Sequence, residues 1–250
     1  TIDDEFKIIK HKGESVIALA GNPNVGKSTV FNYLTGLKQH TGNWTGKTVQ
    51  NAMGCHKSGT NTYIMVDIPG TYSLMAHSAE EEVARDFLCF GEIDAAIVVC
   101  DATCIERNLN LVLQTLEITN NVIVCVNLLD EAKKKKIHID LDKLSFRLGV
   151  KVFGITARNG EGIDEMILSL PQVMQKKSIE TNCVQYNEHI ENAIKLLETA
   201  LRKWLNGKLS SRWTAIRLLE NDEKLITAIC DYTGLNLKTN NTISEAIQNA

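Results

Sequence analysis

Gly21-Asn22-Pro23-Asn24-Val25-Gly26-Lys27-Ser28 stands between an apolar, β-branched run and a pattern typical of a helix. Its glycines, lysine and serine are spaced as in a phosphate-binding loop, and the strand-loop-helix context is the one that this motif requires. Glycine lets the chain turn tightly, and successive N–H groups at a helix N-terminus bind anionic oxygens. We expect Lys27 to reach the β- and γ-phosphates of a nucleotide and Ser28 to ligate Mg2+. The loop, together with Thr29, is predicted to line a nucleotide site.

A second motif, Asp67-Ile68-Pro69-Gly70, follows an apolar run about 40 residues after the loop lysine. An aspartate in this position holds Mg2+ through water, and the glycine N–H senses the γ-phosphate. The next residue is Thr71, where Ras-type enzymes carry a glutamine that orients the attacking water. Without that group the water is poorly positioned, so we expect slow hydrolysis.

Asn127-Leu128-Leu129-Asp130 also follows an apolar run and predicts which base is bound. A carboxylate offers two acceptor oxygens, and guanine offers two adjacent donors, so Asp130 fits guanine and fits adenine poorly. The segment Thr156-Ala157-Arg158 is placed where a backbone N–H could reach guanine O6. Leu128 stands where most such proteins carry a lysine against the base, which favours weak binding and fast exchange.

Short β-branched runs alternate with helical patterns over the first two thirds of the chain, which indicates a mostly parallel sheet with helices on both faces. The fold class is therefore predicted as an α/β P-loop GTPase followed by a small all-helical domain. The expected strands are residues 16–20, 52–55, 63–66, 95–100, 122–126 and 150–155, and the expected helices are 28–36, 79–90, 109–119, 141–149 and 163–174. The expected domains are an N-terminal extension at 1–14, a GTPase domain at 15–176, a linker at 177–185 and a helical domain at 186–250. Trp204 and Trp213 are expected in the core of the helical domain.

The composition excludes several classes of function. A net charge of -3 argues against a nucleic-acid-binding protein, which needs a basic surface. The four lysines at 133–136 are interpreted as a solvated helix face, with a weak contact to anionic lipid left open. Seven scattered cysteines without a CxxC pair indicate a reducing cytosol, and we assign no metal ligand among them. No apolar run approaches the roughly 18 residues of a membrane helix, so we expect a soluble chain.

The four motifs in this order resemble the translation-factor-related GTPases, and further segments are similar to the FeoB family of bacterial ferrous iron transporters. The resemblance covers about residues 15–235. Beyond the phosphate loop, it is carried by Gly42-Asn43-Trp44-Thr45-Gly46-Lys47-Thr48-Val49, by Asp67-Ile68-Pro69-Gly70-Thr71-Tyr72-Ser73-Leu74, by Asn127-Leu128-Leu129-Asp130-Glu131-Ala132, by Gly149-Val150, by Arg158-Asn159-Gly160-Glu161-Gly162-Ile163-Asp164, by Arg212-Trp213 and by Ala215-Ile216-Arg217-Leu218-Leu219-Glu220. The family more often has Pro, Val and Glu where this chain has Thr45, Lys47 and Gln50, which leaves the local loop conformation open.

The resemblance implies a function for the whole protein and several residue roles. It implies a cytosolic GTPase portion at the cytoplasmic face of the bacterial inner membrane, joined to a transmembrane permease in the same polypeptide and served by a small accessory protein. It implies two switch loops, at residues 39–49 and 68–78, with Thr48 as a further Mg2+ ligand. It also suggests that K+ is held by Asn24 and by backbone carbonyls between Gly42 and Trp44. The predicted catalytic set is thus Lys27, Thr48, Gly70 and Asn24, and the predicted cofactors are GTP or GDP, Mg2+ and K+.

Three functional hypotheses follow from these motifs. The first is an enzyme, a slow GTPase whose nucleotide orders the two switch loops. The second is a binding module, in which occupancy by GTP or GDP, and not turnover, controls a partner. The third is a stand-alone GTPase unrelated to iron. A ribosome-associated protein of that kind would need a basic appendage, which the helical part does not offer.

Overall fold

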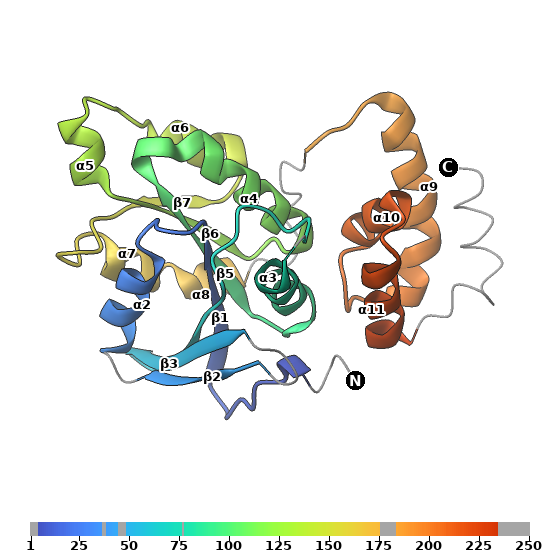
Figure 1. Cartoon of the computed structure of the whole chain (residues 1–250), viewed down its shortest axis with the longest axis horizontal. Helices are drawn as coiled ribbons and strands as arrows, with labels where there is room; N and C mark the ends of the chain where they lie inside the picture. Colours follow the sequence, from blue (N-terminus) through green and yellow to red (C-terminus); the bar gives the residue numbers. More distant parts are fainter. Residues whose placement is uncertain (1–4, 37–38, 45–48, 77, 176–183, 235–250) are drawn as a thin grey trace. The chain divides into compact units, whose positions relative to one another are not determined.

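The computed structural model describes residues 5–36, 39–44, 49–76, 78–175 and 184–234, and of residues 39 and 40 only the backbone. The chain folds into two compact units, one built on residues 6–182 and the other from residue 183 onward (Figure 1). The first unit is an α/β domain, and the second contains only helices among the described residues. This is the predicted fold class. From Phe6 on, the predicted N-terminal extension is part of the α/β unit.

The α/β unit is built on a seven-stranded sheet with the order β2-β3-β4-β1-β5-β6-β7. Neighbouring strands are parallel from β4 through β1 and β5 to β7, whereas β3 runs antiparallel to both β2 and β4. The strands are β1 Glu14–Gly21, β2 Gln39–Asn43, β3 Gln50–Ser58, β4 Asn61–Asp67, β5 Ala95–Asp101, β6 Val122–Asn127 and β7 Lys151–Gly154.

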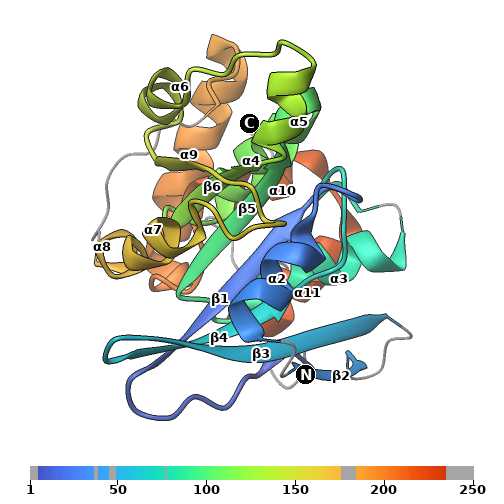
Figure 2. The ribbon, with the colours of Figure 1, turned by 90° about the vertical axis from the view of Figure 1, so that its left-hand side faces the viewer.

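Helices cover both faces of this sheet, as Figures 1 and 2 show. Apolar side chains of α2, α7 and α8 pack with alternate residues of the central strands into one buried core. On the other face lie α3 and α4, whose buried residues include Val83, Phe87 and Leu111. The helices of this unit are α2 Lys27–Thr35, α3 Ala79–Phe90, α4 Ile105–Ile118, α5 Leu129–Lys134, α6 Leu141–Leu148, α7 Ile163–Leu168 and α8 Leu170–Met174, with a 3-10 turn at Ala102–Cys104.

Strand register brings the predicted motifs to one edge of the sheet. Leu19 of β1 pairs with Asp67 of β4, so the loop after β1 and the segment after β4 start side by side. On the other side of β1, the central strands β5 and β6 end level with each other at Asp101 and Asn127. Because ligands of such sheets bind beyond the carboxyl ends of the strands, this edge is where a site is expected.

The predicted strands and helices are all present, with shifted ends. The structure adds α5 and the 3-10 turn, which were not among the expected helices, and two further features differ. Residues 39–43, predicted as part of a switch loop, form the edge strand β2. Their polar sequence does not indicate a strand, because it is the pairing with β3 that holds these residues in place. The predicted helix at 163–174 is interrupted at Ser169, where α8 begins with Pro171 in its first turn. A proline in a first turn lacks the N–H that a continuous helix would use.

The helical unit contains α9 Glu188–Leu205, α10 Ser211–Glu220 and α11 Glu223–Thr233. Its core includes Ile194, Leu197 and Leu201, which recur at helical spacing along α9. Trp213 is buried as predicted, with 3% of its surface exposed. The prediction for Trp204 is wrong, because this residue is 50% exposed and lies off the apolar face of α9.

Across the ranges that the structure describes, no helix is both long and apolar enough to cross a membrane.

A bidentate ion pair joins two helices of the helical unit. The guanidinium of Arg212 donates to both carboxylate oxygens of Glu191, at 2.9 and 2.7 Å, and to the carbonyl of Val184 at 2.9 Å. The hydrogen bonds and charge of Arg212, together with the Tyr186 N–H, lower the pKa of Glu191 from 4.5 to about 2. Paired planar groups of this kind are stronger than ordinary surface pairs.

We predict that Glu191→Gln lowers the free energy of unfolding by roughly 1–3 kcal/mol at neutral pH, because it removes the charge that Arg212 binds. The lowered pKa means that the contribution is fully present above pH 4.5 and is lost as the pH falls toward 2. Thermal melts of wild type and variant between pH 7 and pH 3 check this. The control is Glu198→Gln, because Glu198 pairs with the exposed Arg202 through one contact and otherwise accepts only from the Ser211 hydroxyl among the described residues. A difference that stays constant down to pH 3 would contradict the prediction.

Candidate functional site

The loop between β1 and α2 has the geometry of an anion-binding nest. Asn24 and Gly26 adopt left-handed backbone angles, with φ of 66° and 85°, and Gly26 directly precedes α2. Such alternation turns successive N–H groups toward one side, where they bind anionic oxygens. Gly26 also approaches Asn127 so closely that a Cβ atom would lie 2.3 Å from its amide nitrogen. Glycine is therefore required here both for the backbone angle and for the space.

A hollow of about 490 Å³ lies over this loop. Asn22 lines it with only 2% of its surface exposed, and within the described part of the chain neither of its amide atoms has a hydrogen-bond partner. A buried amide without partners suits a polar ligand in the hollow. Val25, by contrast, points into the core, and Gly21 packs against the carbonyl of Val99. The lining residues are Asn22, Pro23, Asn24, Gly26, Lys27, Ser28, Thr29 and Gly70.

Lys27, Ser28 and Asp67 form a charged cluster at the edge of the hollow. The Lys27 ammonium is ion-paired with the Asp67 carboxylate and also donates to the carbonyl of Ile68 at 2.7 Å. Burial raises the pKa of Asp67, and the charge of Lys27 and hydrogen bonds from Lys27 and Ser28 partly offset that rise. Two of the three predicted Mg2+ ligands, Ser28 and Asp67, therefore meet at one point. A carboxylate and a hydroxyl fit Mg2+, which takes few protein oxygens and keeps several waters or phosphate oxygens.

Asn127 connects the phosphate loop to the segment at 156–158. Its amide nitrogen donates to the carbonyl of Val25 at 2.9 Å, and its amide oxygen accepts from the N–H of Ala157 at 3.0 Å. The side chain is 2% exposed, so these two bonds are shielded from water. Asn127 thus positions two loops, a role that the sequence motif alone did not indicate.

The predicted base-reading residues lie on the two sides of this bridge. Asp130 is half-buried in the first turn of α5, which begins after Leu128 in a left-handed conformation with φ of 63°. Opposite it, the N–H of Thr156 bonds to the carbonyl of Glu161 and Arg158 is exposed. Because Asp130 is only partly buried, a ligand can reach this residue.

The segment after β4 is packed against the protein at Ile68, Thr71 and Leu74, whereas Tyr72 and Met75 are exposed. Gly70 lies against Pro23, where a Cβ would come within 3.3 Å of the proline backbone. Thr71 is 1% exposed, its N–H bonds to the carbonyl of Gly21, and its hydroxyl donates to the carbonyl of Ser73 at 2.6 Å. Because this hydroxyl is engaged inside the protein, Thr71 is not placed to orient an attacking water.

Three polar residues of α4 hold the same segment, and sequence reasoning missed them. The amide oxygen of Gln114 accepts from the N–H of Leu74 at 2.7 Å. Asn110 donates to the carbonyl of Tyr72 at 3.2 Å, and the guanidinium of Arg107 lies 4.1 Å from the centre of the Tyr72 ring. Their spacing of three and four residues places them on one helix face. In the sequence that pattern is indistinguishable from a solvated face.

The segment predicted to supply K+ ligands is not assembled with Asn24. Gly42 lies in β2 and Trp44 directly follows it, and three strand spacings, about 14 Å, separate β2 from β1. The residues present therefore do not form the predicted K+ site in this arrangement. Thr48, the predicted Mg2+ ligand, and its neighbours Thr45, Gly46 and Lys47 lie outside the described residues.

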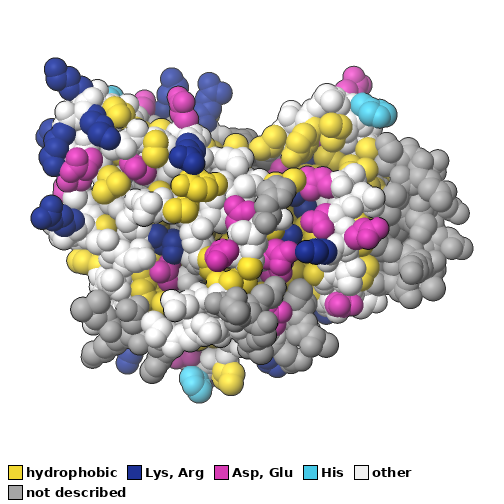
Figure 3. Space-filling view, viewed as in Figure 1, with side chains coloured by type: hydrophobic (Ala, Val, Ile, Leu, Met, Phe, Trp, Pro, Cys, Tyr) yellow, Lys and Arg dark blue, Asp and Glu magenta, His cyan; other side chains and the backbone are white. Residues whose placement is uncertain are grey.

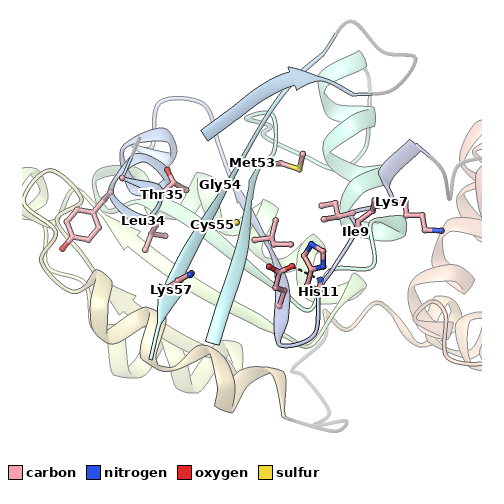
Figure 4. Close-up of a pocket in the computed structure, with 14 residues that line it drawn as sticks. Lys7, Ile9, His11, Leu34, Thr35, Met53, Gly54, Cys55 and Lys57 are labelled. Carbon is pink, nitrogen blue, oxygen red and sulfur yellow. Dashed lines mark hydrogen bonds between the residues drawn. The ribbon is translucent and has the colours of Figure 1, made fainter. Parts of the chain in front are cut away.

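Two surface features are separate from this site. A larger hollow of about 1100 Å³ lies between residues 7–14, the end of α2 and β3 (Figure 4). None of the residues predicted to bind the nucleotide lines it. Lysines 133–136 are exposed at the end of α5, among the dark-blue side chains at the upper left of Figure 3. Lys134 pairs with Glu131 at 2.8 Å. This agrees with a solvated face, and the lipid contact stays a prediction.

Comparison with known proteins gives a consistent set of relatives. The chain matches the family model described as "Ferrous iron transport protein B" over residues 15–170 and that of the "FeoB cytosolic helical domain" over residues 186–250. It is 38% identical over 210 residues to the Fe(2+) transporter FeoB of Shigella flexneri and to that of Escherichia coli K12. These alignments cover 82% of this chain but 27% of each relative, so the chain spans about a quarter of their length.

Solved structures with the same fold include cytosolic domains of two such proteins. The cytosolic domain of T. maritima FeoB in an apo form is 33% identical, with 94% of this chain and 97% of that chain covered and a TM-score of 0.79. A GDP form of the same domain has the same identity and coverage and a TM-score of 0.78. The cytosolic domain of L. pneumophila FeoB is 31% identical, with 94% and 95% covered and a TM-score of 0.78.

We predict that Asn127→Ala loosens both loops at once, because it leaves the carbonyl of Val25 and the N–H of Ala157 without their partner. The free energy of unfolding should fall by roughly 1–3 kcal/mol. Affinity for GDP, measured by calorimetry, should fall about tenfold or more, since each 1.4 kcal/mol of lost positioning is a factor of ten.

Asn121→Ala is the matched control, because Asn121 precedes the opposite end of β6 and its amide donates to the carbonyl of Asp94 at 2.9 Å. That variant should lose stability and keep its affinity for GDP. Equal affinities for GDP in the two variants would show that Asn127 does not position the site.

Proposed function

The chain belongs to the FeoB family of ferrous iron transport proteins, and on that premise we propose that it is the GTPase part of a Fe2+ transporter. It binds GTP with Mg2+ and hydrolyses it slowly to GDP and phosphate, and its two switch segments, at residues 39–49 and 68–78, regulate iron uptake. The observation that carries the proposal is the left-handed nest at Asn24 and Gly26 beside the Lys27, Ser28 and Asp67 cluster.

The residues of the site have distinct roles in this proposal. The N–H groups of the phosphate loop bind the phosphates, and Lys27 exchanges its ion pair with Asp67 for phosphate oxygens. Ser28, Asp67 and Thr48 would hold Mg2+, which supplies positive charge to the phosphate oxygens when bound. Gly70 presents its N–H beside Pro23. Each group stabilises or positions charge, which is the main work of catalysis in phosphoryl transfer.

The base is selected on the other side of the Asn127 bridge. Asp130 accepts from the two adjacent donors of guanine, and the N–H groups of Thr156, Ala157 and Arg158 lie in the segment that approaches guanine O6. The N–H groups of Thr156 and Ala157 are already bonded to Glu161 and Asn127, so Arg158 is the better donor.

Slow turnover is favoured by the position of Thr71. Its buried hydroxyl leaves the attacking water without an orienting side chain from this residue. The same observation favours a second function, in which occupancy by GTP or GDP controls the partner and turnover only resets the state. Comparing the steady-state rate with the nucleotide dissociation rates separates the two, because an occupancy switch exchanges nucleotide faster than it hydrolyses it.

The partners of the chain follow from its family. The relatives are about four times as long as the matched segment, so we propose that a transmembrane permease in the same polypeptide is the main partner, with this part at the cytoplasmic face of the inner membrane. A small accessory protein of iron uptake is a further proposed partner. Nucleic acid is not, because the net charge is -3.

We predict that Asp130→Asn exchanges guanine specificity for xanthine specificity. The variant replaces one acceptor by a donor that clashes with the guanine 2-amino group and suits the carbonyl of xanthine. The binding free energy of GTP should weaken by roughly 1–3 kcal/mol for each polar group left unpaired. Competition between GTP and xanthosine triphosphate measures this change. Glu131→Gln on the same helix is the control and should bind GTP normally. Wild-type GTP affinity in the Asp130 variant would refute the base assignment.

Hydrolysis is predicted to be faster in KCl than in NaCl, with Asn24 responsible for the difference. Neither Thr71 nor a loop arginine supplies the transition state with the help that other GTPases use, so a cation near the phosphates would compensate. Asn24→Gly is the sharpest variant, because glycine keeps the left-handed angle of 66° and removes only the amide. Rates in matched KCl and NaCl should differ for wild type and coincide for the variant. A preference that survives in Asn24→Gly would remove Asn24 from the catalytic residues.

A further inference from the structure

Trp44 is enclosed by two aromatic rings from distant parts of the chain. Its ring centre lies 5.1 Å from that of Phe6 and 4.8 Å from that of Phe87, and the two phenylalanines are 6.0 Å apart. We call these three residues the Trp44 cluster. All of them are buried, with Phe6 at 1%, Trp44 at 4% and Phe87 at 0% exposure. Tilted and edge-to-face rings at such distances attract beyond the burial of their surface.

The Trp44 cluster joins three separate elements of the α/β unit. Phe6 precedes β1, Trp44 directly follows β2, and Phe87 lies in α3. In Figures 1 and 2 the dark-blue start of the described chain lies close to β2. The backbone N–H of Trp44 also bonds to the carbonyl of Val49 at 3.0 Å, which extends the pairing of β2 with β3.

This position conflicts with what the proposed function requires of the same segment. Gly42 and Trp44 must approach the phosphate loop if their carbonyls are to act near Asn24, and β2 lies three strands from β1. The segment therefore has to leave the sheet edge when GTP is bound. The ring of Trp44 is the largest side chain of the segment that must be extracted from a buried place.

One feature of the Trp44 cluster makes its release easier. The indole N–H is buried and, among the described residues, meets no hydrogen-bond acceptor. A buried donor without a partner loses its hydration, so this cost opposes the attraction of the rings. The ring of Trp44, unlike its backbone, is then held by packing alone, and removing one neighbouring ring shifts the balance toward release.

We propose, resting on the proposed function, that Phe6 is a positioning residue that holds Trp44 and its segment away from the phosphate loop, so that GTP binding displaces Trp44 from the Trp44 cluster. Phe6 precedes the part of the chain that matches the family model, which begins at residue 15. In this proposal the segment before β1 disfavours the GTP-bound state. Binding of GDP does not require the segment around Trp44 to move, so the affinity for GDP is unaffected.

The first test follows Trp44 directly in protein labelled with 5-fluorotryptophan. The chain has three tryptophans, and the resonance of Trp44 is identified as the one missing in Trp44→Phe. With GDP this resonance should be insensitive to exchange of H2O for D2O, as for a buried ring. With Mg2+ and a non-hydrolysable GTP analogue it should shift and become sensitive. An unchanged resonance overturns the proposal.

The second test compares nucleotide affinities in variants of the first segment. Phe6→Ala should raise affinity for the GTP analogue by about two- to tenfold, the range that the loss of an aromatic pair allows, and leave affinity for GDP unchanged. Phe6→Leu keeps apolar volume and should give a smaller gain. Ile9→Ala is the control, because Ile9 belongs to the same segment and is 80% exposed.

Each outcome separates the proposal from the function on which it rests. If wild type binds neither GDP nor the GTP analogue, the proposed function is wrong. If it binds both, but Phe6→Ala and Ile9→Ala show the same ratio of affinities as wild type, only the role of Phe6 is wrong. If Phe6→Ala does not fold, Phe6→Leu and the fluorine spectrum of wild type decide, because neither depends on that variant.

Discussion

The two hydrogen bonds of Asn127 are the interaction on which the site depends. Three loops leave the same edge of the sheet, and each has to be placed within hydrogen-bond reach of one ligand. Asn127 ties the phosphate loop to the 156–158 segment from the end of the strand between them, at 2.9 and 3.0 Å. Because both bonds are buried, breaking either would leave an unpaired polar group, so the loops keep their mutual positions. Gly26 is the counterpart of this arrangement, since only a residue without a Cβ leaves room for the amide.

Charge neutrality governs the other side of the site. Lys27 and Asp67 lie in a partly buried place where each compensates the other, and Ser28 adds a hydrogen bond to the carboxylate. A bound nucleotide would bring negatively charged phosphate to this place, and its divalent cation would bring positive charge. In the proposed function the lysine then faces phosphate and the aspartate faces the cation, so no charge becomes buried without a partner. Burial raises the pKa of Asp67, and Lys27 and Ser28 offset only part of that rise.

The two segments proposed as switches are held by different kinds of interaction. The segment after β4 is fixed by directional hydrogen bonds from Gln114 and Asn110, which specify its backbone. The segment that contains β2 is joined to β3 by backbone hydrogen bonds, and the Trp44 side chain after it is held by ring packing in the Trp44 cluster, which is strong but weakly directional. A side chain held by packing is released once an alternative contact compensates for its buried area. In the proposed function this difference suits a GTPase in which one segment senses the phosphate and the other moves.

The sequence by itself determined the α/β fold class, the family and the residues of the phosphate loop. The structure and the relatives confirm the fold class and the family. These features are local, since a glycine-rich turn between a strand and a helix is specified by neighbouring residues. Tertiary structure alone decided the position of β2, the bridging role of Asn127, the anchoring by Gln114 and the enclosure of Trp44 by Phe6 and Phe87. Each of these joins residues far apart in the chain, and no periodicity or spacing records which distant side chain will occupy a given place. The exposure of Trp204 is a further case, because an aromatic residue at helical spacing is buried only if a partner covers its face of the helix.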